Sequence, residues 1–510
     1  MSSSMSTAPE PEPENGQTFV SQGLAESASS HDYEADPVKP YAPAFPADDD
    51  NIANESLHRT STIQKIQSRV SFFNEKLKSE RMGLAWKFFT IYVTMGFFVL
   101  GIFTIYWGSM YNRNSRLKNL SMLVVIDNDT PVNGLPTIGD GLRDLLQSKP
   151  ATEWGSWKIY NREEFGVFAD KYNNTIEEQM RRDVHHQKYW SSIYVRENAT
   201  INYYNALASG DSSYNVTANS ITVIYETGRD FLNMNQYVTP SIQKVEKVWL
   251  AKQSSIIGPL VDSLSNTQKS TLFSQSNYLD LVATPFIFQY NDYIPYTDPV
   301  LVAPSQVGLI YMIILTFFNV NFFMDVHKSV AQLKLKSHHF LIYRLLSSLI
   351  SYAWLSLMYS FVTLSMQVDF TVAFGKSGFL VYWMVSWVTM WCVGSVNEVM
   401  AMGLSLVHPP LIGFWLLFWV IVNISPTFTP LALSPKVFRY GYALPLHNSY
   451  EITKVIFFDT WKGELGRNFG ILAAWSVTMI FVFLGMCVLF GKTMTKRAKE
   501  AAEAELASTA

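Results

Sequence analysis

The stretch FFTIYVTMGFFVLGIFTIYWG, residues 88–108, decides the fold class of this chain. It carries no charge and has the length of ~20 residues that a helix needs to cross the hydrocarbon core of a bilayer. Basic residues flank it unequally, with Lys76, Lys78, Arg81 and Lys87 before it and Arg113, Arg116 and Lys118 after it. Because basic residues accumulate on the cytosolic side, this imbalance predicts a cytosolic N-terminus and an extracytosolic continuation.

Two segments precede this helix. Residues 1–60 are rich in Ser, Pro, Asp, Glu and Ala and show no apolar periodicity, so we expect a disordered cytosolic tail. Residues 61–87 form a basic juxtamembrane segment. The first residues lack the basic region and apolar core of a cleaved secretory signal, so insertion is expected to depend on the helix at 88–108.

Residues 109–303 change to mixed polar character and predict an extracytosolic α/β domain. Strand-like pieces at 121–127 (SMLVVID) and 221–225 (ITVIY) alternate with helix-like pieces at 138–147 and 237–252. The domain also contains N-x-[ST] sequons at Asn128, Asn173, Asn198 and Asn215. Such sites accept glycans only on the lumenal or extracellular face, so their clustering agrees with the charge argument.

Residues 304–491 are almost continuously apolar and predict five more membrane helices. We place them at residues 305–325, 342–366, 378–402, 411–430 and 470–490. The predicted fold class is therefore a multi-pass α-helical membrane protein of about six transmembrane helices, with the α/β domain inserted between helices 1 and 2. Six crossings return the basic tail, residues 492–510, to the cytosol.

The segment 431–469 conflicts with this topology. Parity, meaning five predicted crossings counted from a cytosolic N-terminus, places it outside. Five basic residues nevertheless occur in it, namely Lys436, Arg439, Lys454, Lys462 and Arg467. Its apolar spacing, as in YEITKVIFF (450–458), predicts an interfacial or re-entrant helix. We give parity and the sequons more weight than the charge of one loop.

Composition excludes several classes of function. Lys and Arg number 39 against 42 Asp and Glu, so no field of one sign indicates a nucleic-acid partner. The cysteines Cys392 and Cys487 both lie inside apolar runs, where neither a disulfide framework nor a zinc site is expected.

Three motifs resemble a known family. They are VVIDNDTP (124–131), YWSSIYVRENAT (189–200) and FRYGYALPLHNSYEITKVIFFDTWKGELGRNFGIL (438–472). Together they resemble the fungal nitrosoguanidine-resistance membrane proteins, from about Lys87 to Gly491. That family is similar in layout to the bacterial phage-infection proteins and to the permease halves of ABC-2 type exporters. The resemblance implies a plasma-membrane protein connected with resistance to toxic compounds, through export or through altered lipid organisation.

Motifs of enzymes are absent from the sequence. It has no G-x-x-x-x-G-K-[ST] phosphate loop, G-x-S-x-G elbow, H-E-x-x-H or paired C-x-x-C, so we expect no catalytic, cofactor or metal site and assign any ATPase to another chain. Gly139-Asp140-Gly141 has Asp144 where a dinucleotide fingerprint has its third glycine. Thr137 and Asp140 instead predict a helix capping box. A helix directs the adjacent His185 and His186 about 100° apart, so they cannot easily share a metal, and we interpret them as ordinary surface residues.

Polar residues inside the apolar runs are the candidate functional residues, because hydrocarbon penalises them unless they face protein or water. They are Asn319, Asn321, Asn397, Glu398 and Asn423. Hydrogen bonding between helices is the expected role of the asparagines. For Glu398, an interfacial carboxylate in water and a functional carboxylate are equally compatible with the sequence.

Two functions follow from these observations. The first is transport of amphipathic toxins or phospholipids by the helix block, as a homo-oligomer or with a separate ATPase. Coupling would then use a partner docked at the basic loop around residues 327–339, or an ion path that includes Glu398. The second is a non-transporting regulator or scaffold of other membrane proteins, which the missing energy-coupling motif favours.

Overall fold

The computed structural model describes residues 75, 78–274, 281–333 and 335–509. The predicted tail at 1–60 and most of the segment at 61–87 lie outside this part of the chain. The chain divides into two units, 1–85 and 86–510, and the architecture below is that of the second. Helix α2, Lys78–Met110, contains the apolar run at 88–108 and begins ten residues before it, because the basic flank is helical as well.

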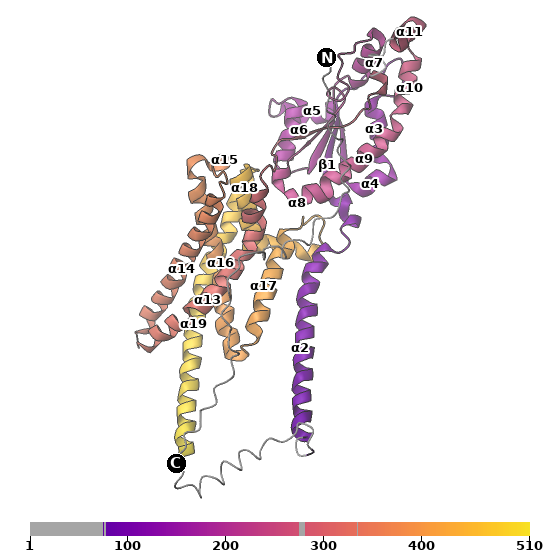
Figure 1. The fold of residues 1–510 in the computed structure, drawn as a ribbon. Helices are drawn as coiled ribbons and strands as arrows, with labels where there is room; N and C mark the ends of the chain where they lie inside the picture. The colour runs from indigo at the N-terminus through magenta and orange to yellow at the C-terminus, as the bar shows by residue number, and fades with distance from the viewer. Residues whose placement is uncertain (1–74, 76–77, 275–280, 334, 510) are drawn as a thin grey trace, which may run out of the picture. The chain divides into compact units, whose positions relative to one another are not determined.

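A five-stranded sheet forms the centre of an α/β domain (Figure 1). Its strands are β1 (Ser121–Ile126), β2 (Ser156–Asn161), β3 (Ser191–Val195), β4 (Ile221–Tyr225) and β5 (Gln289–Asp292). The strand order is β2-β1-β3-β4-β5, and β3 pairs with β4 antiparallel while the other neighbours are parallel. The pieces SMLVVID and ITVIY thus supply β1 and β4.

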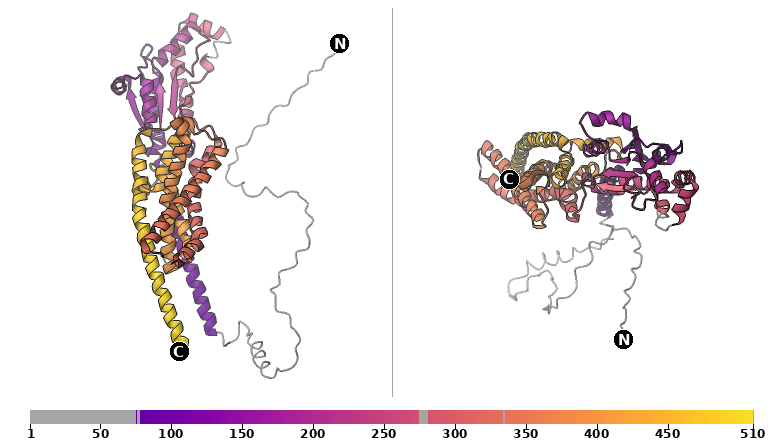
Figure 2. Two further views of the ribbon diagram at one scale, coloured as in Figure 1. Left: turned by 90° about the vertical axis from the view of Figure 1, so that its left-hand side faces the viewer. Right: turned by 90° about the horizontal axis from the view of Figure 1, so that it is seen from above.

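Helices cover both faces of this sheet (Figures 1 and 2). The longer ones are α3 (Ile138–Gln147), α5 (Arg162–Asp170), α6 (Ile176–His185), α7 (Ala199–Ser209), α9 (Thr239–Lys252), α10 (Ser254–Asp262) and α11 (Asn266–Ser274). Short helices are α4 (Lys149–Trp154) and α8 (Phe231–Asn233), with η2 (Asn114–Asn119), η3 (Thr227–Arg229) and η4 (Met234–Val238) between longer elements. A sheet covered on both sides needs apolar residues on both, which explains the unbroken run MLVVI in β1.

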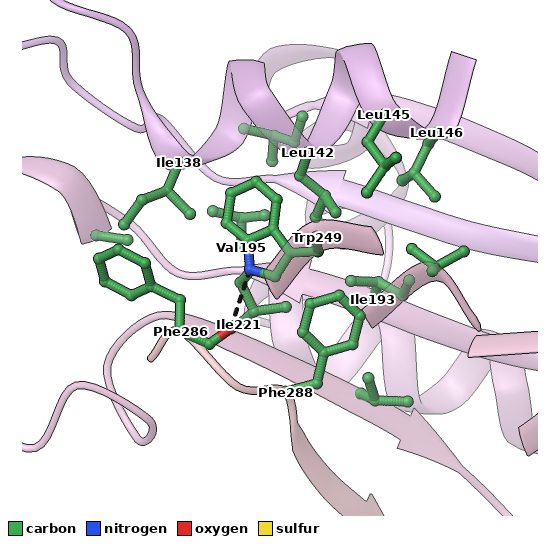
Figure 3. Close-up of a cluster of buried hydrophobic side chains, with 14 of the residues drawn as sticks. Ile138, Leu142, Leu145, Leu146, Ile193, Val195, Ile221, Trp249, Phe286 and Phe288 are labelled. Atoms are coloured by element: carbon green, nitrogen blue, oxygen red, sulfur yellow. Dashed lines mark hydrogen bonds between the residues drawn. The ribbon is translucent and has the colours of Figure 1, made fainter. Parts of the chain in front are cut away.

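Successive residues of β1 enter two different cores. Met122, Val124 and Ile126 face the larger core beneath α3, α7 and α9, whereas Leu123 and Val125 face Phe165 and Met180 of α5 and α6. Figure 3 shows the larger core, where the Trp249 indole N–H donates to the Phe286 carbonyl at 2.9 Å. This bond satisfies the polar atom of a fully buried ring.

The remaining helices form the membrane block, which packs around α16. They are α13 (Gly308–Gln332), α14 (Ser337–Ser365), α15 (Thr371–Phe374), α16 (Gly378–Val407), α17 (Leu411–Thr427), α18 (Pro445–Phe458) and α19 (Leu465–Thr509). Shorter turns are η5 (Pro299–Leu301), η6 (Ala303–Val307), η7 (Gly375–Ser377), η8 (Lys436–Ala443) and η9 (Lys462–Glu464).

Five helical stretches of the described chain are long and apolar enough to cross a membrane: Lys78–Met110, Pro299–Gln332, Ser337–Ser365, Thr371–Val407 and Lys462–Ala507. The predicted helix at 411–430 is shorter, since α17 has 17 residues and ends at Thr427 after Pro426. That length is below the ~20 residues of a full crossing. The chain is therefore a multi-pass helical membrane protein, and the sixth crossing is not established by length.

Helix α18 lies in the segment 431–469, for which we predicted an interfacial or re-entrant helix. Almost all of its side chains are buried, because α16, α17, α19 and α15 pack around it. The basic residues that conflicted with parity are largely neutralised here. Three of them form ion pairs with the segment's acids: Lys454 with Glu451, Lys462 with Asp459, and Arg467 with Glu464.

Candidate functional site

Glu398 lies at the centre of a buried polar cluster between α14 and α16. Its Oε2 accepts from the Arg344 guanidinium at 2.8 Å and from the Ser348 hydroxyl at 3.0 Å, and its Oε1 accepts from the Tyr352 hydroxyl at 2.7 Å. The side chains of Glu398 and Arg344 are only 4% and 8% exposed. The interpretation of Glu398 as an interfacial carboxylate in water is therefore wrong, since the residue is buried and paired.

Sequence reasoning missed Arg344, Ser348 and Tyr352, although their spacing carried a signal. These residues recur every four positions along α14, and Ser356 and Ser360 continue the same buried stripe. The apolar residues Leu346, Ile350 and Trp354 of the same helix are exposed. A helix that buries its polar face and exposes its apolar face is expected where lipid replaces water as the solvent.

The predicted asparagines occupy different environments. Asn397 joins three helices, because its amide donates to the Ile313 carbonyl and Thr316 hydroxyl of α13 and accepts from the Trp415 indole of α17. Asn319 is buried and hydrogen-bonds the Tyr352 hydroxyl, which extends the Glu398 cluster toward α13. These two residues agree with the expected bonding between helices.

Asn321 and Asn423 do not have that role among the described contacts. Asn321 is exposed on α13. Asn423 is buried, but its amide donates to the Trp419 carbonyl of its own helix, and its Oδ1 has no hydrogen-bond partner in the described part of the chain.

An apolar groove lies beside the Glu398 cluster. It has a volume of about 570 Å³, and α13 and α14 form its walls. Leu346, Ile350 and Trp354 line it, whereas Asn319 and Ser347 are among its few polar residues. Because Asn319 both lines the groove and bonds Tyr352, the groove is connected to the ion pair by one hydrogen-bonded chain.

A second cavity, the junction cavity, lies where the α/β domain meets the membrane block. It has a volume of about 320 Å³. Its charged lining residues are Arg229 and Asp230 of the domain and Glu451, Lys454, Glu464 and Arg467 of the block. Burial lowers the pKa of Arg229 to about 10, and burial raises the pKa of Asp230 against the opposing effect of Lys454.

His185 and His186 are not ordinary surface residues, which corrects our interpretation. The two rings do point to different places. His185 Nδ1 lies 3.0 Å from Glu226 Oε1, whereas the His186 ring stacks on Trp461 at 5.4 Å. The hydrogen bond to Glu226 raises the pKa of His185, while burial and Arg182 lower that of His186. Both therefore belong to the contact between domain and membrane block.

The carboxyl ends of β1 and β3 form the topological switch point of the sheet, where α/β proteins bind ligands. Here the Asp129 carboxylate fills the position. It accepts from the Gly139 N–H of α3 at 2.8 Å and from the Thr200 N–H at 2.7 Å. A bound phosphate would use such N–H groups at a helix N-terminus, so the protein's own anion occupies the place that a nucleotide would need.

The Thr137 hydroxyl caps α3 by accepting from the Asp140 N–H at 2.9 Å. The Asp140 carboxylate accepts from the Thr137 hydroxyl, which forms the predicted pairing without the backbone bond of a full capping box. Within the part of the chain that the structure describes, no group of three or more His, Cys, Asp or Glu side chains could hold a metal ion.

The four predicted sequons lie in the α/β domain. Asn128, Asn173 and Asn215 are exposed, whereas Asn198 is partly buried and its Oδ1 accepts from the Thr130 hydroxyl at 2.7 Å. A further sequon, Asn119-Leu120-Ser121, escaped our sequence analysis. The Asn119 amide nitrogen donates to the Ala432 carbonyl at 3.0 Å, and a glycan on that nitrogen would occupy the same space.

The fold and these sites define a multi-pass α-helical membrane protein with an inserted α/β domain. The chain belongs to the family described as Protein of unknown function (DUF3533), whose model matches residues 91–481. It is 31% identical over 442 residues to the uncharacterized endoplasmic reticulum membrane protein YJR015W of Saccharomyces cerevisiae, covering 85% of this chain and 84% of that protein. No solved structure matches it.

Proposed function

We propose that the protein handles amphipathic molecules of the bilayer, by exporting toxic compounds or by altering lipid organisation, and so contributes to resistance to such compounds. The observation that carries this proposal is the apolar groove between α13 and α14 with Asn319 inside it. An apolar groove with a small number of polar groups suits a ligand with an acyl chain and a polar head. The resemblance to resistance proteins and exporter permeases supports the same function.

The proposed topology has six crossings, with α17 as the fourth helix of the block and both termini in the cytosol. The contact between Phe98 near the middle of α2 and Phe414 near the start of α17 supports a partly embedded start for α17. The α/β domain would then face the lumen or the exterior and carry glycans at Asn128, Asn173, Asn198 and Asn215. For the compartment we propose the plasma membrane, with the endoplasmic reticulum named for the yeast relative as the alternative.

A non-transporting regulator is the second candidate. The complete pairing of Glu398 favours it, because a carboxylate that accepts from Arg344, Ser348 and Tyr352 is committed to packing rather than available for an ion path. Export would then require a partner, either a separate ATPase or a second copy of this chain. We propose no enzymatic activity of its own.

Reconstitution separates these functions. Purified full-length protein in liposomes is tested for movement of a fluorescent phospholipid analogue, with Leu346→Trp and Ile350→Trp filling the groove and Leu380→Trp, an exposed position of α16 outside the groove, as the matched control. We expect movement that the groove variants slow and the control does not. Equal movement in protein-free liposomes would contradict transport by this chain alone.

A further inference from the structure

We propose that the junction cavity binds a zwitterionic headgroup in which a phosphate is joined to a primary ammonium, as in phosphatidylethanolamine. This inference rests on the proposed function, since it names a lipid class that the membrane block would recognise. It uses a site separate from the α13–α14 groove, because the two sets of lining residues share no member.

The position of the cavity suits a headgroup. Its lining includes Thr427, the last residue of α17, together with Glu464 and Arg467 at the start of the span Lys462–Ala507. The cavity therefore lies where apolar helices give way to the polar domain, at the level of a lipid headgroup rather than of its acyl chains. The domain closes the cavity with Arg229 and Asp230.

The charges of the cavity balance. Arg229, Lys454 and Arg467 line it together with Asp230, Glu451 and Glu464, and Lys454 and Arg467 pair with Glu451 and Glu464 along its wall. A lining of one sign would favour an anion or a cation alone, whereas this balance complements a ligand that carries both charges. Lys454 is nearly buried and donates to Glu451 at 2.8 Å. An ammonium has three donors, so Lys454 retains capacity for a phosphate oxygen.

His447 specifies the kind of ammonium. Its ring is buried, lines the cavity, and hydrogen-bonds the Pro426 carbonyl, a bond in which the ring must donate. Its Nδ1 is buried without a hydrogen-bond partner among the described residues. In the neutral ring that atom is an acceptor, and leaving it unpaired costs ~1–3 kcal/mol in general. A primary ammonium supplies the missing N–H, whereas the quaternary ammonium of choline has none.

The test uses soluble short-chain lipids and the full-length protein in detergent. Dihexanoyl phosphatidylethanolamine, dihexanoyl phosphatidylcholine and free phosphoethanolamine are titrated, and binding is measured by isothermal calorimetry. Arg467→Gln removes a partly exposed cation of the cavity, and His447→Phe removes the acceptor while keeping an aromatic ring. Lys462→Gln is the matched control, because Lys462 lies one turn away and does not line the cavity.

We expect saturable binding of the ethanolamine lipid, weakened about tenfold or more by Arg467→Gln and by His447→Phe but not by Lys462→Gln. If Arg467→Gln does not fold, His447→Phe carries the test, and preference over the choline lipid in the unmodified protein supports the inference independently. Phosphoethanolamine that binds as tightly as the lipid would support the zwitterion but identify a soluble source.

Equal binding of the choline and ethanolamine lipids, or equal binding to all variants, would overturn the inference. Failure here is distinguishable from failure of the proposed function. If no headgroup binds but groove variants still slow lipid movement, only the junction site is refuted. If groove variants have no effect while headgroup binding persists, the transport proposal fails and the headgroup site stands.

Discussion

The buried Arg344–Glu398 pair gives the sharpest test of how α14 is held to α16. Glu398→Gln keeps the shape of the side chain but removes the charge that faces the guanidinium at 2.8 Å. Removing one member of a buried ion pair costs ~3–5 kcal/mol, because the other charge is left uncompensated in a medium of low polarity. That corresponds to a loss of roughly two to four orders of magnitude in the ratio of folded to unfolded protein.

The double variant Arg344→Met with Glu398→Met is expected to recover most of this loss, since apolar residues of similar volume often replace a buried pair at little cost. The Ser348 hydroxyl that is left behind already reaches the Arg344 carbonyl at 3.2 Å. Glu464→Gln is the control, because its partly exposed pair with Arg467 should contribute ~0–1 kcal/mol.

Thermal stability is followed as the fraction of detergent-solubilised full-length protein that remains monodisperse after heating. Glu398→Gln, Arg344→Met and Glu398→Met should each lose stability strongly when made alone, the double variant little and Glu464→Gln hardly at all. A Glu398→Gln protein as stable as the unmodified chain, or a double variant no better than the singles, would refute the argument. If Glu398→Gln kept its abundance and location yet weakened toxin resistance, Glu398 would instead belong to a transport path.

Three further predictions concern other parts of the chain. Glycosidase treatment should shift the gel mobility of the protein, and replacing Asn128, Asn173, Asn198 and Asn215 together should abolish that shift. Asn119 should carry no glycan, because its amide bonds Ala432. Protease sensitivity of the domain from the cytosolic side would contradict the topology. Deleting residues 1–60 should leave insertion and delivery largely intact, because they contain no membrane run, and a chain retained inside the cell would show an address in the tail. The hydrogen bond to Glu226 raises the pKa of His185 above 6.5, with Asp459 adding to the rise and Arg181 opposing it. The contribution of the His185–Glu226 pair to stability should therefore be complete below about pH 6.5 and decline as the pH rises through the raised pKa. The free energy of unfolding measured across this range should lose that pH dependence in His185→Gln, and an unchanged profile would exclude the pair as its source.

Sequence patterns predicted the elements whose signal is local. The apolar runs at 88–108 and 378–402 correspond to parts of α2 and α16 because hydrocarbon requires that length from each helix by itself. The pieces 121–127 and 138–147 correspond to β1 and α3, because the pattern of apolar residues within each piece is enough to indicate its secondary structure. The boundaries differ most where polar flanks continue the helix, as they do at Lys78 and at Thr509.

Partners that are distant in sequence were beyond this reasoning. Glu398 and Arg344 are 54 positions apart, so no window links them, although each position lies in a helix that was predicted. The same holds for Arg113, which we counted only as a flanking charge. Its guanidinium donates to the Tyr237 hydroxyl at 2.8 Å and to the Thr429 hydroxyl at 2.7 Å, which ties the end of α2 to both the domain and the membrane block.

Close packing joins the α/β domain, which has no cysteine, to the membrane block at the junction. Tyr296 is stacked between Phe231 of the domain and Phe458 of α18, with ring centroids 4.3 and 4.8 Å apart. Gly228 lies so close to Phe458 that a β-carbon there would approach its Cβ to 2.9 Å. Helix α18 also packs on α16, which carries Glu398. Helix α18 therefore lines the junction cavity and also packs on the helix that holds the buried ion pair, so it is the packed element between the two sites.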